Sequence, residues 1–294
     1  MNYLYYPGCS LTASAREYDL STRAVMAAAG SGLTEIKDWT CCGASAAAPI
    51  SHLLSLSLSA RNLALAEQMA ADQPGDGDQL LVPCSACYLN LKKARETLRS
   101  DLDGRVKINA ALAAVDLAAT GSMPVRHLLD VLSVDLGTST LAPLASRSLS
   151  GLTVAPYYGC QCLRPYLEFD DPECPTSMAP LIALTGADVH SWDMGARCCG
   201  ASLVSTNPDV GLERVMAILQ AARGADLIAT VCPMCQINLD GWQSKASRMA
   251  GEDLSITVLY LPQLLGLAMG LNQQELGLNL NLALLDGFRE KIDH

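Results

Sequence analysis

Short apolar runs alternate with longer amphipathic stretches along the whole chain. The stretches at 53–69 and 208–222 place apolar side chains three and four positions apart, which predicts two helices. The short apolar runs predict strands, and they lie at 4–6, 80–82, 155–158 and 228–231. Strands that alternate with helices predict an α/β fold, with a small parallel sheet flanked by helices.

The longest apolar segment covers residues 256–271. Pro262 and Gln263 interrupt it, and it is shorter than the ~20 residues that a membrane-spanning helix needs. We therefore expect a strand followed by a buried helix, and no membrane span.

The second half of the chain repeats the landmarks of the first half in the same order. Cys41-Cys42-Gly43-Ala44-Ser45 has a letter-for-letter match in residues 198–202. The other matched landmarks are Gly8-Cys9 with Gly159-Cys160, Cys84-x-x-Cys87 with Cys232-x-x-Cys235, and Asn90 with Asn238. Such a repeat predicts two similar domains related by internal duplication, at 1–145 and 146–294. Their boundary is expected in the Ser-, Thr- and Gly-bearing stretch 137–151.

Each half carries five cysteines at matching places, and most of them come after a predicted strand. Ligands of parallel α/β sheets bind where the loops at the carboxyl ends of the strands meet. We therefore expect five thiols to converge in each domain. The ten candidate ligands are Cys9, Cys41, Cys42, Cys84 and Cys87 in the first half, and Cys160, Cys198, Cys199, Cys232 and Cys235 in the second.

Convergent thiols of this number favour an iron–sulfur cluster, which is held by cysteine thiolates. Adjacent cysteines such as Cys41 and Cys42 would form a strained disulfide, because their Cα atoms lie only ~3.8 Å apart. They can instead contact neighbouring metal atoms. The glycine that follows each pair, Gly43 or Gly200, lets the backbone approach a bulky ligand closely.

Other uses of these cysteines remain open at this stage. A structural zinc ion could take any four of the five thiols in one domain. A thioredoxin-like dithiol would explain each Cys-x-x-Cys but not the remaining cysteines. Cys162 and Cys174 have no counterparts in the first half, and we interpret them as incidental.

Charge and composition narrow the functional classes. The chain of 294 residues has a formal net charge of -10 and no run of Lys or Arg, so nucleic acid and anionic membranes are unexpected partners. The first ten residues lack the features of a signal peptide. Twelve cysteines without an export signal predict a cytoplasmic protein with reduced thiols rather than a disulfide framework. The low share of charged residues, 17%, suggests that other protein chains cover part of the surface.

Taken together, the two cysteine sets resemble those of the duplicated CCG-domain family, which includes the B-type subunits of heterodisulfide reductase and of related complexes. The resemblance covers nearly the whole chain. It implies that the ten cysteines hold two noncubane [4Fe-4S] clusters, one per domain, and that a disulfide is reduced or formed in the space between them. It implies an oxidoreductase with no catalytic residues beyond the cluster ligands. Implied partners are a C-type cubane iron–sulfur subunit, an A-type flavin subunit, and a disulfide, thiol or lipoyl-bound sulfur substrate.

Two further hypotheses compete with disulfide chemistry. The chain could be an electron-relay CCG subunit of a quinone-linked dehydrogenase, or a zinc-stabilised scaffold without redox activity. The sequence has neither a ferredoxin-type Cys-x2-Cys-x2-Cys run nor a glycine-rich dinucleotide fingerprint, so those functions are expected on other chains.

Overall fold

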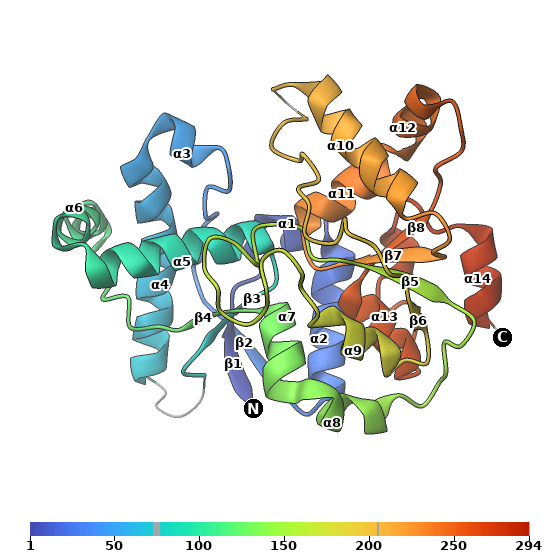
Figure 1. Cartoon of the computed structure of the whole chain (residues 1–294). Coiled ribbons are helices and arrows are strands. Elements are labelled where there is room, and N and C mark those ends of the chain that lie inside the picture. Colours follow the sequence, from blue (N-terminus) through green and yellow to red (C-terminus); the bar gives the residue numbers. More distant parts are fainter. Residues whose placement is uncertain (73–76, 205, 294) are drawn as a thin grey trace. The chain divides into compact units, whose positions relative to one another are not determined.

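The computed structural model describes residues 1–72, 77–204 and 206–293. Contacts between Cα atoms divide the chain into two compact units. The first unit consists of Met1–Ser14 and Gly30–Leu128, and the second consists of Ala15–Ala29 and Leu129–His294. Figure 1 shows the elements of both units along the chain.

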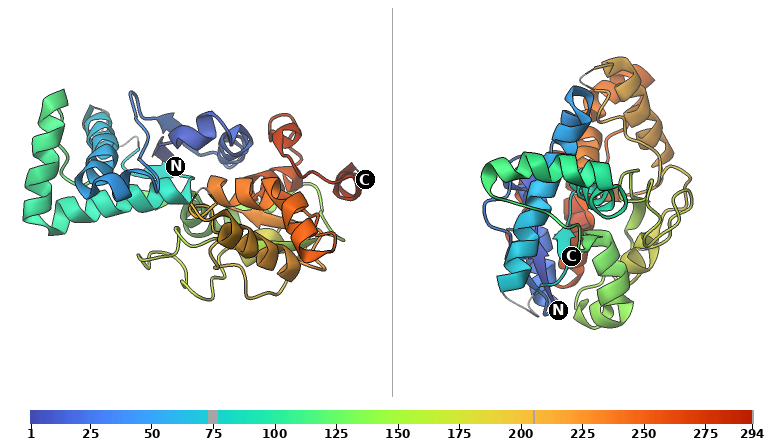
Figure 2. Two further views of the ribbon diagram at one scale, coloured as in Figure 1. Left: turned by 90° about the horizontal axis from the view of Figure 1, so that it is seen from above. Right: turned by 90° about the vertical axis from the view of Figure 1, so that its left-hand side faces the viewer.

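The first unit contains a four-stranded parallel sheet. Its strands are β1 (Asn2–Tyr5), β2 (Gly32–Glu35), β3 (Leu80–Val82) and β4 (Val125–His127), in the order β2-β1-β3-β4. Central β1 pairs with β2 through Leu4 and Thr34, and with β3 through Leu4 and Leu80. The connecting helices α4 (His52–Asp72), α5 (Ser85–Ser100) and α6 (Leu102–Leu112) pack against one another (Figure 2, blue to green). Shorter elements of this unit are α1 (Gly8–Thr12), α3 (Ala47–Ile50) and η1 (Ala113–Val115).

The second unit repeats this sheet. Its strands are β5 (Thr153–Tyr157), β6 (Asp188–Val189), β7 (Leu227–Thr230) and β8 (Thr257–Tyr260), in the matching order β6-β5-β7-β8 and again all parallel. The predicted α/β fold with a parallel sheet in each repeat is therefore confirmed. The helices of the second repeat are α9 (Met178–Ala183), α10 (Pro208–Ala221), α11 (Pro233–Gly241), α12 (Gln243–Ala250), α13 (Leu261–Ala268), η4 (Leu278–Leu280) and α14 (Asp286–Asp293).

The central strands β3 and β7 are buried along their whole length, which explains their continuous apolar runs. Every residue of the edge strand β8 is buried as well. The expected strand and buried helix in 256–271 are β8 and α13, and every residue of α13 is buried. No helix in the described part of the chain is long and apolar enough to cross a membrane.

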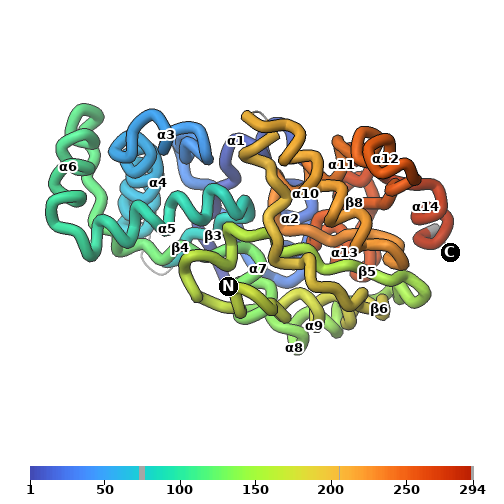
Figure 3. Tube along the Cα trace, turned by 45° about the horizontal axis from the view of Figure 1, so that its top comes forward, coloured from blue at the N-terminus to red at the C-terminus, as the bar shows by residue number. Residues whose placement is uncertain are grey.

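Helix α2 (Arg16–Ala28) comes from the first repeat but belongs to the second unit. It lies beside α13 (Figures 1 and 3). The Tyr18 ring stacks on the Tyr260 ring with centroids 4.1 Å apart, and its hydroxyl donates to the Val231 carbonyl at 3.1 Å. The compact units therefore do not follow continuous halves of the chain. The division at residue 145 stays a prediction about the sequence repeats.

Residues 131–144 also belong to the second unit. They form the π-helical turn η2 (Val131–Leu136), α8 (Gly137–Leu141) and η3 (Ala142–Leu144), after the short helix α7 (Leu128–Asp130). Both η2 and α8 contact α9, a helix of the second repeat. Elements of both repeats therefore build the second unit.

Candidate functional site

The five predicted thiols of the first unit gather in one place. Cys9 lies in α1, just after β1, and Cys84 and Cys87 lie at the start of α5, just after β3. The Sγ atoms of Cys9 and Cys41 are 3.6 Å apart, and those of Cys42 and Cys87 are 3.3 Å apart. Cys84 completes the set through its hydrogen-bond contact with Cys87.

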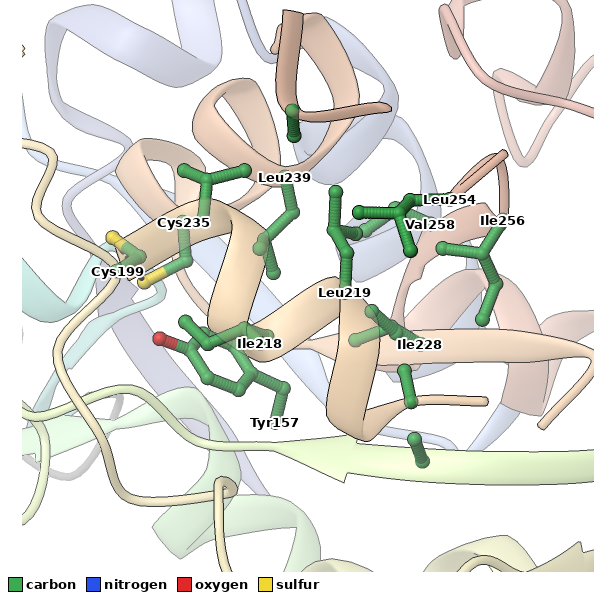
Figure 4. Packing of buried hydrophobic residues seen from close by; sticks show 14 of the residues in the cluster. Tyr157, Cys199, Ile218, Leu219, Ile228, Cys235, Leu239, Leu254, Ile256 and Val258 are labelled. Atoms are coloured by element: carbon green, nitrogen blue, oxygen red, sulfur yellow. Dashed lines mark hydrogen bonds between the residues drawn. The ribbon is translucent and has the colours of Figure 1, made fainter. Parts of the chain in front are cut away.

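The five thiols of the second unit gather in the same way. The Sγ atoms of Cys199 and Cys235 are 3.5 Å apart, and Figure 4 shows them together at the end of the apolar core. Cys160 hydrogen-bonds to Cys198, and Cys232 contacts Cys235. In both units the predicted residues are therefore neighbours in space.

The adjacent cysteines do not follow their strands as closely as the repeat suggested. Strand β2 ends at Glu35 and β6 ends at Val189, whereas the pairs begin at Cys41 and Cys198. A loop that contains a tryptophan, Trp39 or Trp192, leads from each strand to the pair. The pairs therefore need other residues to fix their position.

A matched tyrosine holds each loop. The hydroxyl of Tyr6 donates to the Thr40 carbonyl at 2.8 Å, and that of Tyr157 donates to the Arg197 carbonyl at 2.7 Å. Each acceptor directly precedes a cysteine pair. Burial, followed by the nearby thiols, raises the pKa of both tyrosines far above the usual range, so the hydroxyls stay protonated as donors. Both tyrosines lie within apolar runs that predict strands, so the sequence alone does not reveal the role of their hydroxyls.

A matched asparagine fixes the other side of each pair. The Asn90 side-chain amide donates to the Ala44 carbonyl at 2.8 Å and approaches the Cys42 Sγ at 3.8 Å. The Asn238 amide donates to the Cys199 carbonyl at 3.0 Å. The repeat had already shown that these two asparagines correspond, and the structure adds their role.

Backbone amides point at the cysteine sulfurs. The Gly43 and Gly200 amides donate to the Sγ atoms of Cys41 and Cys198, each at 3.4 Å. The Ala44 amide donates to the Cys42 Sγ at 3.4 Å. Such donors stabilise negative charge on sulfur.

A glycine opens the space beside each Cys-x-x-Cys. Gly8 has a φ of +72°, and a Cβ atom there would lie 2.9 Å from the Cys87 Sγ. Gly159 has a φ of +70°, and its Cβ atom would lie 3.0 Å from the Cys235 Sγ. Both the backbone conformation and the available space therefore require glycine.

The thiols of each set strongly affect one another's protonation. The hydrogen bond from Cys41, followed by that from Cys87, lowers the pKa of Cys42 to about 3, and the contact with Cys42 raises the pKa of Cys41. In the second unit, the hydrogen bond from Cys160 lowers the pKa of Cys198 to about 6. The Gly200 amide and the positive charges of Arg214 and Arg164 act in the same direction. Each set thus contains one thiol, Cys42 or Cys198, whose pKa is lowered towards the thiolate form that binds metal. Hydrogen bonds with neighbouring thiols, followed by burial, raise the pKa of Cys41, Cys87, Cys160 and Cys235.

The donor set fits a cysteine-ligated iron–sulfur cluster. Five sulfurs, backbone amide donors and a glycine-lined space converge in each unit. Among the described residues, no three Cys, His, Asp or Glu side chains are arranged to hold a single metal ion. The sulfurs contact one another in a series, since Cys87 contacts both Cys42 and Cys84, and Cys235 contacts both Cys199 and Cys232.

The two remaining cysteines have different surroundings. Cys162 is buried, and its thiol donates to the Tyr158 carbonyl at 3.3 Å. Cys174 is exposed and lines a cavity of ≈ 460 Å³ together with His190 and Trp192. Their interpretation as incidental cysteines stays a prediction.

The chain is similar to known redox proteins over most of its length. It is 36% identical to the 8-methylmenaquinol:fumarate reductase membrane anchor subunit of Wolinella succinogenes, covering 95% of this chain and 96% of that protein. It is 32% identical to the B-type subunit of the ferredoxin/F420H2-dependent CoB-CoM heterodisulfide reductase of Methanosarcina acetivorans, covering 77% and 75%. These relatives are subunits of redox complexes, which confirms the predicted class of oxidoreductase and electron-transfer proteins.

A solved structure and a family model complete the comparison. The crystal structure of a hypothetical protein from Helicobacter pylori matches 97% of this chain and 52% of its own with a TM-score of 0.75; at 17% identity this shows the fold alone. The model of the cysteine-rich domain CCG matches residues 3–92 and 154–240, and these ranges hold all ten predicted ligands. The chain therefore belongs to the CCG family and carries its cysteine-rich domain twice.

Proposed function

We propose that this chain is the iron–sulfur subunit of a multi-subunit oxidoreductase and holds one noncubane [4Fe-4S] cluster in each unit. The observation that carries the proposal is the convergence of two complete, matched sets of five thiols. The ligands are Cys9, Cys41, Cys42, Cys84 and Cys87, and Cys160, Cys198, Cys199, Cys232 and Cys235.

When bound, such a cluster accepts and donates single electrons. The protein residues prepare its place. Thiolates supply the negative charge that iron binds, and the amides of Gly43 and Gly200 stabilise that charge on sulfur. Tyr6 and Tyr157 hold the loops that carry the cysteine pairs. The six buried ligands keep most of each site away from water.

The iron and acid-labile sulfide content of protein purified without air tests the proposal. About eight atoms of each per chain are expected for two four-iron clusters. A zinc-containing, colourless protein without iron would instead support the structural zinc site.

The reaction we favour is electron transfer in a quinone-linked complex. The supporting observation is the 36% identity to the 8-methylmenaquinol:fumarate reductase subunit over nearly the full length of both chains. In this role, the chain would pass electrons between a quinol-reactive partner and a flavin-bearing dehydrogenase partner. No sulfur substrate would be needed.

Disulfide or thiol chemistry is the second candidate. It is supported by the likeness to a B-type heterodisulfide reductase subunit and by the exposure of Cys9, Cys41 and Cys198. An exposed edge of the thiol set gives a substrate sulfur access to the site. The partners would then be a C-type cubane subunit and an A-type flavin subunit, in the cytoplasm where thiols stay reduced.

The chemically reduced, cluster-loaded chain separates these two reactions. Oxidation of the chain by a heterodisulfide, with release of two thiols, would support sulfur chemistry. If a water-soluble menaquinone analogue oxidises the chain only when the partner subunits of the chain are present, the electron relay would be supported. A matched test with Cys9→Ser shows whether the exposed edge of the first site takes part.

A further inference from the structure

The two thiol sites have different electrostatic surroundings despite their common ligands. The residue four positions after the first cysteine of each set is Ala13 in the first repeat and Arg164 in the second. In the second site, by contrast, two arginines lie against the loop that carries the cysteine pair. Arg164 donates to the Ala196 carbonyl, and the Cβ of Arg214 lies beside Gly200.

The side chain that covers the glycine after each cysteine pair also differs. A Cβ atom at Gly43 would lie 3.2 Å from a methyl carbon of Leu58 on α4. A Cβ atom at Gly200 would lie 3.3 Å from the Cβ of Arg214 on α10. Beside the pair, α4 therefore contributes an apolar side chain in the first unit, whereas α10 contributes an arginine in the second.

Arg164 is held rigidly at the second site. Its guanidinium donates to the Ala196 carbonyl at 2.6 Å, just before the cysteine pair, and to the Pro172 carbonyl at 3.3 Å. Its ion pair with Glu173, at 2.7 Å, offsets part of its charge. Arg214 is exposed and follows the acidic Glu213, whose side chain is exposed as well. Arg214 is therefore the better residue for a clean test.

We propose that Arg214, supported by Arg164, makes the cluster of the second unit the one with the higher reduction potential. This inference rests on the proposed function and ranks the reduction potentials of its two clusters. Reduction adds one electron, and so one negative charge, to a cluster. A nearby cation stabilises the reduced form more than the oxidised form, because the attraction grows with the negative charge. An apolar neighbour such as Leu58 has no such effect.

The experiment is a potentiometric titration of the cluster-loaded, full-length chain, followed by electron paramagnetic resonance. A one-electron donor such as dithionite supplies the electrons. Cys42→Ser and Cys199→Ser identify which signal belongs to which unit. Arg214→Leu is expected to lower the equilibrium constant for reduction of the second-unit cluster by up to about tenfold, or ~59 mV for one electron. The potential of the first-unit cluster is expected to stay unchanged.

Three variants serve as controls. Arg214→Lys keeps the charge and should restore most of the potential. Leu58→Arg places a cation at the matching position and should raise the potential of the first-unit cluster. Arg223→Leu also removes one positive charge, but beyond the end of α10. Because ordinary salt screens charges over ~10 Å, the potential of the second-unit cluster should stay unaffected.

The outcomes separate this inference from the function on which it rests. A chain purified without iron would overturn the proposed function and the inference together. Two intact clusters whose potentials do not respond to Arg214→Leu, or a second-unit cluster with the lower potential, would overturn the inference alone.

Discussion

At the scale of residues, a few side chains outside the ligand sets determine where the cysteine pairs lie. Tyr6 and Tyr157 each reach from the end of a central strand to the carbonyl that precedes a pair. Tyr6 also contacts Trp39 edge to face, with ring centroids 5.5 Å apart. Tyr6 thus adds one hydrogen bond and one aromatic contact to a loop that Asn62 also holds, through the amide and the carbonyl of Thr40.

Tyr6→Phe should loosen the first site without changing its packing. The phenylalanine ring keeps its contact with Trp39 but leaves the Thr40 carbonyl with only the Asn62 amide as donor. The loss of one hydrogen bond should cost about 0.5–1.5 kcal/mol in the free energy of unfolding. Urea unfolding of the metal-free protein measures this loss. Unchanged stability together with unchanged iron content would show that the hydroxyl does not hold the loop.

Gly159→Ala should disturb the second site more than its backbone strain alone explains. The new Cβ would approach the Cys235 Sγ at 3.0 Å in a left-handed backbone conformation. Gly251→Ala is the matched control, because Gly251 has a similar φ of +72° and nothing within 4 Å of the added atom. The control should lose about 1 kcal/mol. Equal losses of stability and of iron in both variants would contradict the steric role of Gly159.

The sequence could predict all ten thiols that converge, because a cysteine pattern repeated twice is a strong signal. It could not predict the roles of Tyr6, Arg164 or Arg214. A tyrosine in a strand has the same pattern whether its hydroxyl is used or not. The electrostatic effect of an arginine on a cysteine that is distant in sequence depends on how the chain packs, which only the fold reveals.

At the scale of elements, α2 is notable because it carries a buried acid into the second unit. Glu17 lies in its first turn and is only 6% exposed. Its backbone packs against Gly277, where an added Cβ would lie 2.8 Å from the Glu17 Cα. Burial, with a smaller contribution from Asp240, raises the pKa of Glu17 from 4.5 to about 6.

This pKa predicts a pH dependence of stability. The folded state holds the Glu17 proton more tightly than the unfolded state, so the contribution of Glu17 to stability falls as the pH rises from about 4.5 through about 6. Glu17→Gln should remove that fall. The free energy of unfolding of the variant, minus that of the parent protein, should therefore be larger at pH 8 than at pH 4. Urea unfolding at both pH values measures this. Parallel losses in parent and variant would contradict the role of Glu17.

The elements themselves were predictable where the periodicity was strong. The helical patterns at 53–69 and 208–222 became α4 and α10, and the interrupted apolar segment became β8 and α13. The association of α2 with α13 was not predictable, because the apolar pattern of a helix does not indicate which sheet or helix its apolar face packs against. The π-helical turn η2 was also not foreseen.

At the scale of the whole molecule, the duplication makes the two sites separable by mutation. Cys42→Ser should remove about half of the bound iron, and Cys199→Ser should remove the other half, because each site has its own complete ligand set. Metal analysis with both single variants and the double variant measures this. Loss of all iron in either single variant would contradict independent sites.

The composition of the units predicts how the chain tolerates cutting. A fragment of residues 146–294 lacks α2, so α13 loses one of the helices that pack against it. We expect it to unfold at lower urea concentration than the intact chain and to aggregate, as measured by circular dichroism and gel filtration. A fragment with full stability would show that α2 contributes little to the second unit.

The placement of α2 also determines when this helix can reach its native contacts during synthesis. The Tyr18 hydroxyl bonds to a carbonyl 213 residues further along the chain. At about 5–20 residues per second, a ribosome needs roughly 10–40 s to produce that partner after it has made α2. Throughout that interval the apolar face of the helix has no native cover. Nascent chains stalled before β8 should therefore be clients of chaperones that bind exposed apolar segments.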